Sequence, residues 1–215
     1  MKHIQTRHSA GLRVATRTVA AAACAAALAG CTAPLLVGGA VAGGAAVVLD
    51  RRSTGTQVED QAIELKAMNR VREAVGDRAH VNVTSYNRQV LLTGEAPSEA
   101  DRTAIEQAVS RVDNVRTIVN ELAVMAPSSL SARSNDAILT TKVKATYVDA
   151  KDLHAQAVKV VTERGIVYLM GRVTEREAER ATDLARRVAG VQKVVRVFET
   201  LTEAELADMK PKAVK

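Results

Sequence analysis

Histidine is the side chain in this sequence most suited to acid–base or metal chemistry, and the chain beyond residue 31 contains His80 and His154. Each lies near the start of an expected strand and without a nearby cysteine, which makes the pair a poor metal site. The sequence lacks the Gly-x-Ser-x-Gly, HExxH and phosphate-loop patterns of common hydrolases, metallopeptidases and nucleotide-binding proteins. We therefore predict that the protein is not an enzyme and holds no metal or other cofactor.

Alternating charges form the other group of candidate residues. Glu175, Glu177 and Glu179 alternate with Arg176 and Arg180 in a segment with helical periodicity. We interpret them as a solvated helix face of i,i+4 ion pairs rather than as a carboxylate site.

Cys31 is the residue with the clearest covalent chemistry. Residues 1–17 are polar and basic, residues 19–30 are small and apolar, and Leu28-Ala29-Gly30-Cys31 resembles the bacterial lipobox at all four positions. Small residues before the cut fit the backbone into a signal peptidase, and the cysteine thiolate after the cut accepts a diacylglyceryl group. We predict a lipoprotein signal peptide over 1–30 and membrane anchoring through acylated Cys31.

Two alternatives to this anchor remain on the sequence alone, an ordinary signal peptide and a single membrane-spanning helix. The stretch from Val19 to Leu49 contains no charge, and about 20 apolar residues span a bilayer. This run, however, is rich in Ala and Gly and only weakly hydrophobic. Thr32 follows the cysteine, and by resemblance to lipoprotein sorting the absence of Asp there favours the periplasmic face of the outer membrane.

The charge balance argues against a nucleic-acid partner. The whole chain has 30 Lys and Arg against 24 Asp and Glu. Removal of the predicted signal peptide takes away four basic residues and no acidic one, which leaves 26 against 24. Such a balance provides no strong footprint for phosphates.

The chain has no Trp, one Phe and three Tyr, so its cores are expected to be small and aliphatic. Such cores favour two thin domains over one thick domain. Residues 31–56, which are Gly-rich and apolar up to Leu49, are expected to form a flexible tether or a segment at the bilayer surface. In the second case Arg51 and Arg52 would meet lipid phosphates.

Beyond Gly55 the sequence repeats itself. Each copy opens with an acid-led amphipathic segment, in which a spacing of four residues predicts one buried helical stripe. The acid suits the positive end of a helix. The two sets are Asp60, Ile63, Ala67 and Val71 in the first copy, and Asp136, Leu139, Val143 and Tyr147 in the second.

The rest of each copy predicts a hairpin, a second helix and a closing strand. The hairpins comprise 81–86 with 90–94 and 158–163 with 167–171, ending at Gly94 and Gly171; the second helices cover 98–112 and 174–188, and the closing strands lie in 115–122 and 194–201. Both copies therefore read αββαβ, an α+β fold. We assign domains to 57–126 and 135–203, a linker to 127–134 and a tail to 204–215.

This pattern resembles the BON domain, a family of small αββαβ modules of bacterial envelope proteins. The resemblance is carried by Asp136-x-x-Leu139-x-x-x-Val143, Gly165-x-Val167-x-Leu169-x-Gly171-x-Val173 and Val188-x-Gly190-Val191, and by Asp60-x-x-Ile63, Val90-x-Leu92-x-Gly94 and Val112-x-x-Val115. It implies a non-enzymatic protein that supports outer-membrane integrity. It also implies binding of anionic phospholipid, such as phosphatidylglycerol or cardiolipin, through the second domain, and enrichment at division sites.

The two first helices differ at one informative position. Ile138 lies one residue, or about 100°, off the core stripe of the second copy, and Lys142 follows it one turn later. The first copy has Ala62 and Lys66 instead. An exposed Ile near lysines suits insertion between anionic headgroups, so the predicted lipid-binding residues are Ile138, Thr141, Lys142, Lys144 and Ala145.

Three alternatives to lipid contact stay open. Single exposed apolar residues are ordinary, and Ile138 would also be explained by packing between the domains. A different class of function, an adaptor whose exposed faces dock an envelope protein such as an assembly machine, fits the same features.

Overall fold

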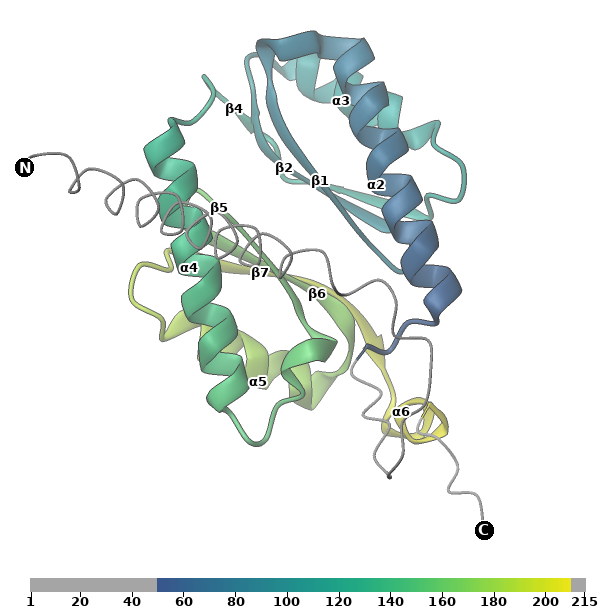
Figure 1. Ribbon diagram of the computed structural model, residues 1–215, viewed down its shortest axis with the longest axis vertical. Coiled ribbons are helices and arrows are strands. Elements are labelled where there is room, and N and C mark those ends of the chain that lie inside the picture. The colour runs from purple at the N-terminus through teal and green to yellow at the C-terminus, as the bar shows by residue number, and fades with distance from the viewer. Residues whose placement is uncertain (1–49, 210–215) are drawn as a thin grey trace, which may run out of the picture. The chain divides into compact units, whose positions relative to one another are not determined.

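The computed structural model describes residues 50–209, which contain two successive αββαβ units (Figure 1). Both units belong to the same compact body. The predicted signal peptide, Cys31 and the tether up to residue 49 lie outside the described residues.

The first unit begins with the long helix α2 (Thr54–Val75), followed by a 3-10 turn η1 (Gly76–Arg78). The strands β1 (His80–Tyr86) and β2 (Gln89–Ala96) then form an antiparallel hairpin. Helix α3 (Glu99–Ser110) returns the chain so that β3 (Thr117–Asn120) and the short β4 (Ala123–Val124) pair in parallel with β2.

The second unit repeats this topology. It comprises α4 (Leu130–Asp149), η2 (Ala155–Ala157), β5 (Lys159–Glu163), β6 (Ile166–Thr174), α5 (Glu175–Arg186) and β7 (Lys193–Leu201). The hairpin β5–β6 is antiparallel and β7 is parallel to β6. A short helix, α6 (Glu203–Asp208), follows. The predicted α+β class and αββαβ order are confirmed.

Helices extend past the predicted domain limits, because serine and threonine serve as helix caps as well as linker residues. The linker expected over 127–134 ends at Ser129, whose Oγ accepts a hydrogen bond from Ala132 N at 3.2 Å and caps α4. Ser53 caps α2 in the same way, so that this helix begins inside the expected tether. Most of the described part of the expected tail is α6.

Each unit has its own core between its helices and one face of its sheet. The buried stripes of α2 and α4 are those predicted from the four-residue spacing. In the first core Ile63, Ala67 and Val71 pack with Val90, Leu92 and Ile105, and in the second Val143 and Tyr147 pack with Val167, Leu169, Ala181 and Ala185.

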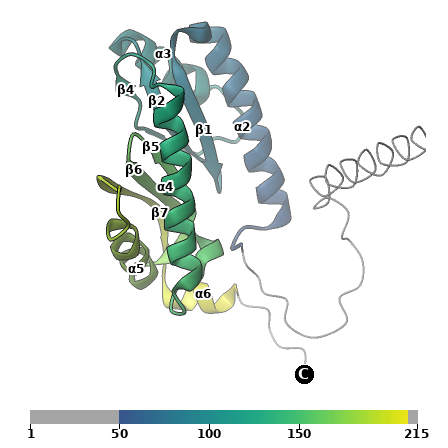
Figure 2. The same cartoon turned by 60° about the vertical axis from the view of Figure 1, so that its left-hand side comes forward.

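A third core lies between the two sheets. Tyr86 and Leu91 of the first unit pack with Tyr168, Met170 and Val197 of the second, and all are buried. Each sheet therefore has both faces covered, one by its own helices and one by the other sheet. In Figure 1 and in Figure 2, α4 lies in front of its sheet.

The acid near the start of each first helix caps a hairpin turn rather than its own helix. Asp136 lies in the second turn of α4, and its carboxylate accepts hydrogen bonds from the backbone amides of Arg164 and Gly165, both at 2.8 Å. Asp60 accepts the equivalent bonds from Asn87 and Arg88. The turn residues have positive φ angles, as tight two-residue hairpins require. The expectation that these acids stabilise the helix start is therefore wrong.

Gly94 and Gly171 lie inside their strands rather than at the strand ends. A Cβ at Gly94, where φ is +115°, would lie 2.1 Å from the carbonyl oxygen of His80. At Gly171 it would lie 2.3 Å from that of Ala157. Both glycines are structural as predicted, because they allow a neighbouring backbone to approach closely.

Candidate functional site

The outward side of α4 carries all five residues predicted to contact lipid. Ile138, Thr141, Lys142, Lys144 and Ala145 are exposed, and the side chain of Ile138 is 55% exposed. The inward side packs into the second core. The expectation that Ile138 lies off the buried stripe is confirmed, and packing between the domains does not explain this residue.

Helical geometry arranges these residues as an apolar strip with a lysine on each side. At about 100° per residue, one line of small and apolar residues faces away from the core. We call it the α4 strip; it consists of Leu130, Ser134, Ile138, Thr141, Ala145 and Val148. Lys142 and Lys144 project about 80° from its centre on opposite sides.

The ends of the α4 strip were missed from the sequence. Leu130 is 79% exposed and Val148 is 74% exposed, which makes them more accessible than Ile138. Leu130 fell within the expected linker, although the i, i+3, i+7, i+10 spacing from Ile138 to Val148 could have identified the other end. With both ends included, the strip extends along about 27 Å of the helix axis.

The charges around the α4 strip are mainly positive. Within residues 50–209 neither Lys142 nor Lys144 takes part in an ion pair, so both ammonium groups are available to an anionic surface. Arg133 near the start of the helix adds to them, and Asp149 at its last residue is the exposed acid.

The first helix of the other unit differs in charge rather than in exposed apolar area. The position equivalent to Ile138 is Ala62, but α2 carries large apolar groups elsewhere, since Val58, Leu65 and Met68 are 62%, 65% and 44% exposed. They were missed because the comparison considered one position, Ala62. Acidic and basic side chains alternate around the α2 residues, namely Glu59, Glu64 and Glu73 with Lys66, Arg70 and Arg72. This balance makes α2 the poorer match to an anionic surface.

Arg51 and Arg52 do not face outward toward lipid phosphates, which corrects that alternative for the tether. The guanidinium of Arg51 donates to both carboxylate oxygens of Glu177 on α5, at 2.7 and 2.6 Å, and to the carbonyl of Arg172. Burial alone would raise the pKa of Glu177, but Arg51 and the backbone amide of Thr174 lower it to about 2.

Arg52 holds the same segment against the first unit. It pairs with Asp50 and Asp60 at 2.7 and 2.8 Å, and its guanidinium lies 4.1 Å from the centre of the Tyr86 ring. Burial opposes ionisation of Asp60, but hydrogen bonds from Ser85, Arg88 and Arg52 lower its pKa. The two arginines thus attach the start of the described chain to both units.

The prediction that α5 carries a solvated face of i,i+4 ion pairs is wrong. Glu177 is buried, and Glu175, Arg176 and Arg180 pair with residues of other elements instead of with one another. Glu175 pairs with Arg196 at 2.9 Å, Arg180 with Asp152 at 2.8 Å, and Arg176 with Glu203 at 3.9 Å.

The two histidines lie in different environments. His154 is exposed, whereas the Nδ1 atom of His80 donates to the buried carboxylate of Glu95 at 3.0 Å, beside Glu163. Burial, with smaller contributions from Glu95 and Asp136, raises the pKa of Glu163. Within residues 50–209 neither imidazole is hydrogen-bonded to a hydroxyl group, so the described part contains no Ser-His arrangement. The sequence analysis did not find this group of His80, Glu95 and Glu163. The alternation of residues along the strands, which places the three side chains on the inner sheet faces, was the signal that could have found it.

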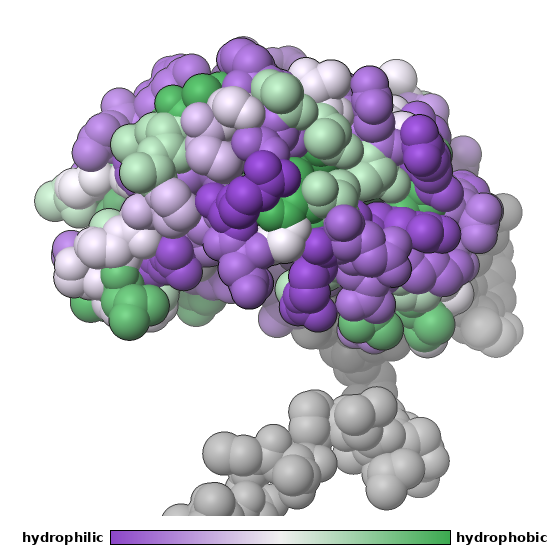
Figure 3. Space-filling model, turned by 90° about the horizontal axis from the view of Figure 1, so that it is seen from above, coloured by the Kyte–Doolittle hydropathy of each residue, from purple (hydrophilic) through white to green (hydrophobic). Residues whose placement is uncertain are grey.

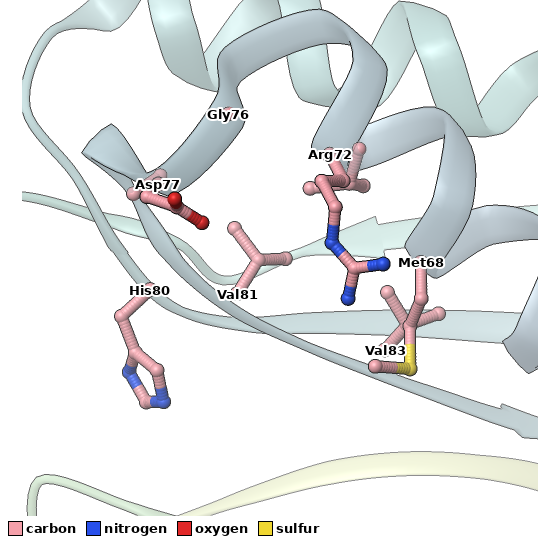
Figure 4. A pocket seen from close by; sticks show the side chains of 9 residues that line it. Met68, Arg72, Gly76, Asp77, His80, Val81 and Val83 are labelled. Carbon is pink, nitrogen blue, oxygen red and sulfur yellow. The ribbon is translucent and has the colours of Figure 1, made fainter.

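A shallow hollow of about 180 Å³ lies beside the end of α2. Met68, Arg72 and Val83 border it, and the ring of His80 points away from Met68 and Arg72 (Figure 4). The polar side chains that line it are those of Arg72, Asp77 and His80.

No helix within residues 50–209 has the length and hydropathy needed to cross a membrane. On the face shown in Figure 3, hydrophilic residues predominate and hydrophobic residues form small separate patches.

Two segments of the chain match one family. Residues 59–126 and 135–201 each match the BON domain. The outer membrane lipoprotein DolP of Haemophilus influenzae is 40% identical over 177 residues, covering 81% of this chain and 90% of that protein. The 21 kDa hemolysin of Actinobacillus pleuropneumoniae is 34% identical over 152 residues, covering 70% and 78%. Among solved structures, CdsD of the Chlamydia trachomatis type III secretion system covers 69% of this chain and 99% of its own at 11% identity, and its TM-score of 0.28 is too low for any argument.

Proposed function

Since this chain belongs to the BON-domain family, as a dual BON protein similar to the outer membrane lipoprotein DolP, we propose that its second domain binds anionic phospholipid through the α4 strip. The protein is an outer-membrane lipoprotein of this family. The proposed ligand is phosphatidylglycerol or cardiolipin, and the proposed role is binding rather than catalysis.

The observation that carries this proposal is the apolar α4 strip with lysines on both sides. Ile138, Leu130 and Val148 have the size to enter the boundary between headgroups and acyl chains, while Thr141 and Ala145 let the helix approach closely. Lys142 and Lys144 then reach lipid phosphates on either side. Each basic residue near an anionic surface contributes about 1 kcal/mol, so binding should be moderate and sensitive to salt.

An acylated Cys31 would make moderate affinity sufficient. A tethered module meets the surface at a high effective concentration, and the second contact then becomes intramolecular. We propose that the acyl chains hold the protein on the membrane and that the α4 strip selects the lipid. We also propose, on the family resemblance, that this contact supports outer-membrane integrity and enriches the protein at division sites.

Vesicle flotation with the non-acylated fragment 31–215 tests the proposal. We expect the fragment to float with vesicles that contain phosphatidylglycerol or cardiolipin and to stay at the bottom with pure phosphatidylcholine vesicles. Equal flotation with both would contradict recognition of anionic lipid, and flotation with neither would contradict the lipid proposal altogether.

The exposed apolar residues of α2 favour a second candidate function, an adaptor that docks an envelope protein. Val58 and Leu65 lie on the outward side of α2, where charges of both signs surround them. Such a mixed surface suits a protein partner better than an anionic membrane. A fragment that binds no vesicle, but forms a specific crosslink from position 65 to an envelope protein, would favour this candidate.

A further inference from the structure

A buried cluster of possible metal ligands lies between the two sheets. His80 begins β1, Glu95 lies opposite it on β2, and Glu163 ends β5 of the other unit. One ligand atom from each of the three side chains lies within 4.8 Å of the other two. Glu95 is fully buried and Glu163 is 2% exposed, so this is not a group of surface acids.

The charge of Glu95 is well compensated. Its carboxylate accepts hydrogen bonds from His80 Nδ1 and from the backbone amide of Ser128, both at 3.0 Å. The guanidinium of Arg164 lies 3.3 Å from its other oxygen. These donors satisfy a buried carboxylate in the way that protein interiors require.

The charge of Glu163 is poorly compensated by comparison. Within the described part of the chain its carboxylate accepts one hydrogen bond, 2.8 Å long, from the neutral amide of Asn82. Of the nearby charges, His80 favours the ionised form of Glu163, whereas Glu95 and Asp136 oppose it. A buried carboxylate needs a counter-charge, and here a second carboxylate and an imidazole lie beside it.

We propose that His80, Glu95 and Glu163 form a binding site for a divalent transition-metal ion, for which Zn²⁺ is the probe. Imidazole nitrogen and carboxylate oxygen both bind Zn²⁺ at about 2.0–2.2 Å, and three protein ligands leave a fourth position for water. Imidazole also makes the set a poor match for Mg²⁺. Arg164 can remain on the other oxygen of Glu95.

Occupation of the site needs only local movement. Ligand atoms that share a four-coordinate ion lie roughly 3.4 Å apart at these bond lengths, against a present spread of up to 4.8 Å. His80 and Glu95 are already close, so Glu163 is the side chain that must move inward. The ion replaces the hydrogen bond between His80 and Glu95.

Metal binding would clamp the two domains together, because two ligands belong to the first domain and the third to the second. An ion that binds only the assembled arrangement stabilises it in proportion to the logarithm of its concentration. This inference does not rest on lipid binding, and either can hold without the other.

Zinc titration of the full chain tests the inference. The protein is purified in mild detergent, stripped with EDTA, dialysed and titrated with Zn²⁺ in a calorimeter, and Co²⁺ serves as a coloured substitute. We expect one saturable site per chain, a higher melting temperature with Zn²⁺, and a visible Co²⁺ spectrum typical of four-coordinate nitrogen and oxygen ligation. Glu163→Gln and His80→Ala should each weaken Zn²⁺ binding at least tenfold.

His154→Ala is the matched control, because His154 occupies the corresponding region of the second domain but lies exposed. It should bind Zn²⁺ as the wild type does. Glu163→Gln keeps the side-chain shape, so its metal-free form should melt at or above the wild-type temperature and gain nothing from Zn²⁺. The inference is overturned if the wild type shows no saturable binding, if both cluster variants still bind normally, or if His154→Ala abolishes binding.

Discussion

Arg51 donates two hydrogen bonds to Glu177, which lies 126 residues later in the chain, and the side chains are only 8% and 3% exposed. This pair attaches the last part of the predicted tether to the second domain. It also makes Glu177 the acid whose ionisation the fold depends on most clearly.

Stability should therefore fall in acid. The pKa of Glu177 is about 2 in the folded protein, against 4.5 for an unperturbed glutamate. The stabilisation is thus fully present above pH 4.5 and is lost as the pH falls toward 2. It amounts to about 3 kcal/mol. Thermal melts between pH 2 and 7 should show this loss for the wild type and a flatter profile for Glu177→Gln. Glu203→Gln, at an exposed pair, should behave like the wild type.

Breaking the pair from the other side should be more damaging. Arg51→Ala leaves the carboxylate of Glu177 buried without its partner, which costs about 3–5 kcal/mol. Chemical denaturation at pH 7 measures the loss. A cost below about 1 kcal/mol would mean that this pair behaves like an exposed one.

Substitutions on α4 should separate lipid contact from core packing. Ile138→Asp should abolish flotation with anionic vesicles but change stability by no more than about 0.5 kcal/mol. Val143→Asp should unfold the second domain, because it buries an unpaired charge. Flotation and thermal melting of both variants decide the matter. If Ile138→Asp melts as early as Val143→Asp, the outward position of Ile138 is wrong.

The two first helices should differ in their effect on lipid binding. Leu65→Asp on α2 is the matched control for Ile138→Asp, since both replace an exposed apolar residue. It should leave flotation unchanged, whereas Lys142→Glu should weaken flotation by about 30-fold, from a loss of roughly 2 kcal/mol. Added salt should narrow the gap between Lys142→Glu and the wild type. Equal losses for Leu65→Asp and Ile138→Asp would assign the lipid contact to both domains.

Gly171 should tolerate no side chain. Gly171 has a φ of +153°, and Gly171→Ala places a Cβ 2.3 Å from the carbonyl oxygen of Ala157. We therefore expect the free energy of unfolding to fall by more than about 2 kcal/mol. Gly55→Ala is the control, because its Cβ meets only the Oγ of Ser53 at 3.9 Å and the residue is helical. That variant should gain up to about 1 kcal/mol. Melting of both variants tests the comparison.

The anchor prediction concerns Cys31, which lies outside the described residues. Cys31→Ala should block acylation and leave an unprocessed precursor in the inner membrane. Membrane fractionation and intact-mass analysis measure both effects. A variant that is still cut after Gly30 and sediments with the outer membrane would exclude the lipobox.

The sequence by itself determined the repeated αββαβ order, the buried stripes of the first helices and the outward position of Ile138. Periodicities of two and of about 3.6 residues are local properties, and each copy supported the other. The sequence did not indicate that α4 begins within the expected linker, because Ser129 is a residue type found both in linkers and at helix caps.

Only the tertiary structure decided how the second face of each sheet is used. That face mixes residues such as Tyr168 and Met170 with Glu95 and Glu163, so its alternation looks the same whether it meets water or another sheet. Packing of the two sheets buried Tyr86 against the second domain, joined Arg51 to Glu177 and brought His80 next to acids from both domains. These contacts depend on the docking of two complete domains, and no local pattern in either copy specifies that docking.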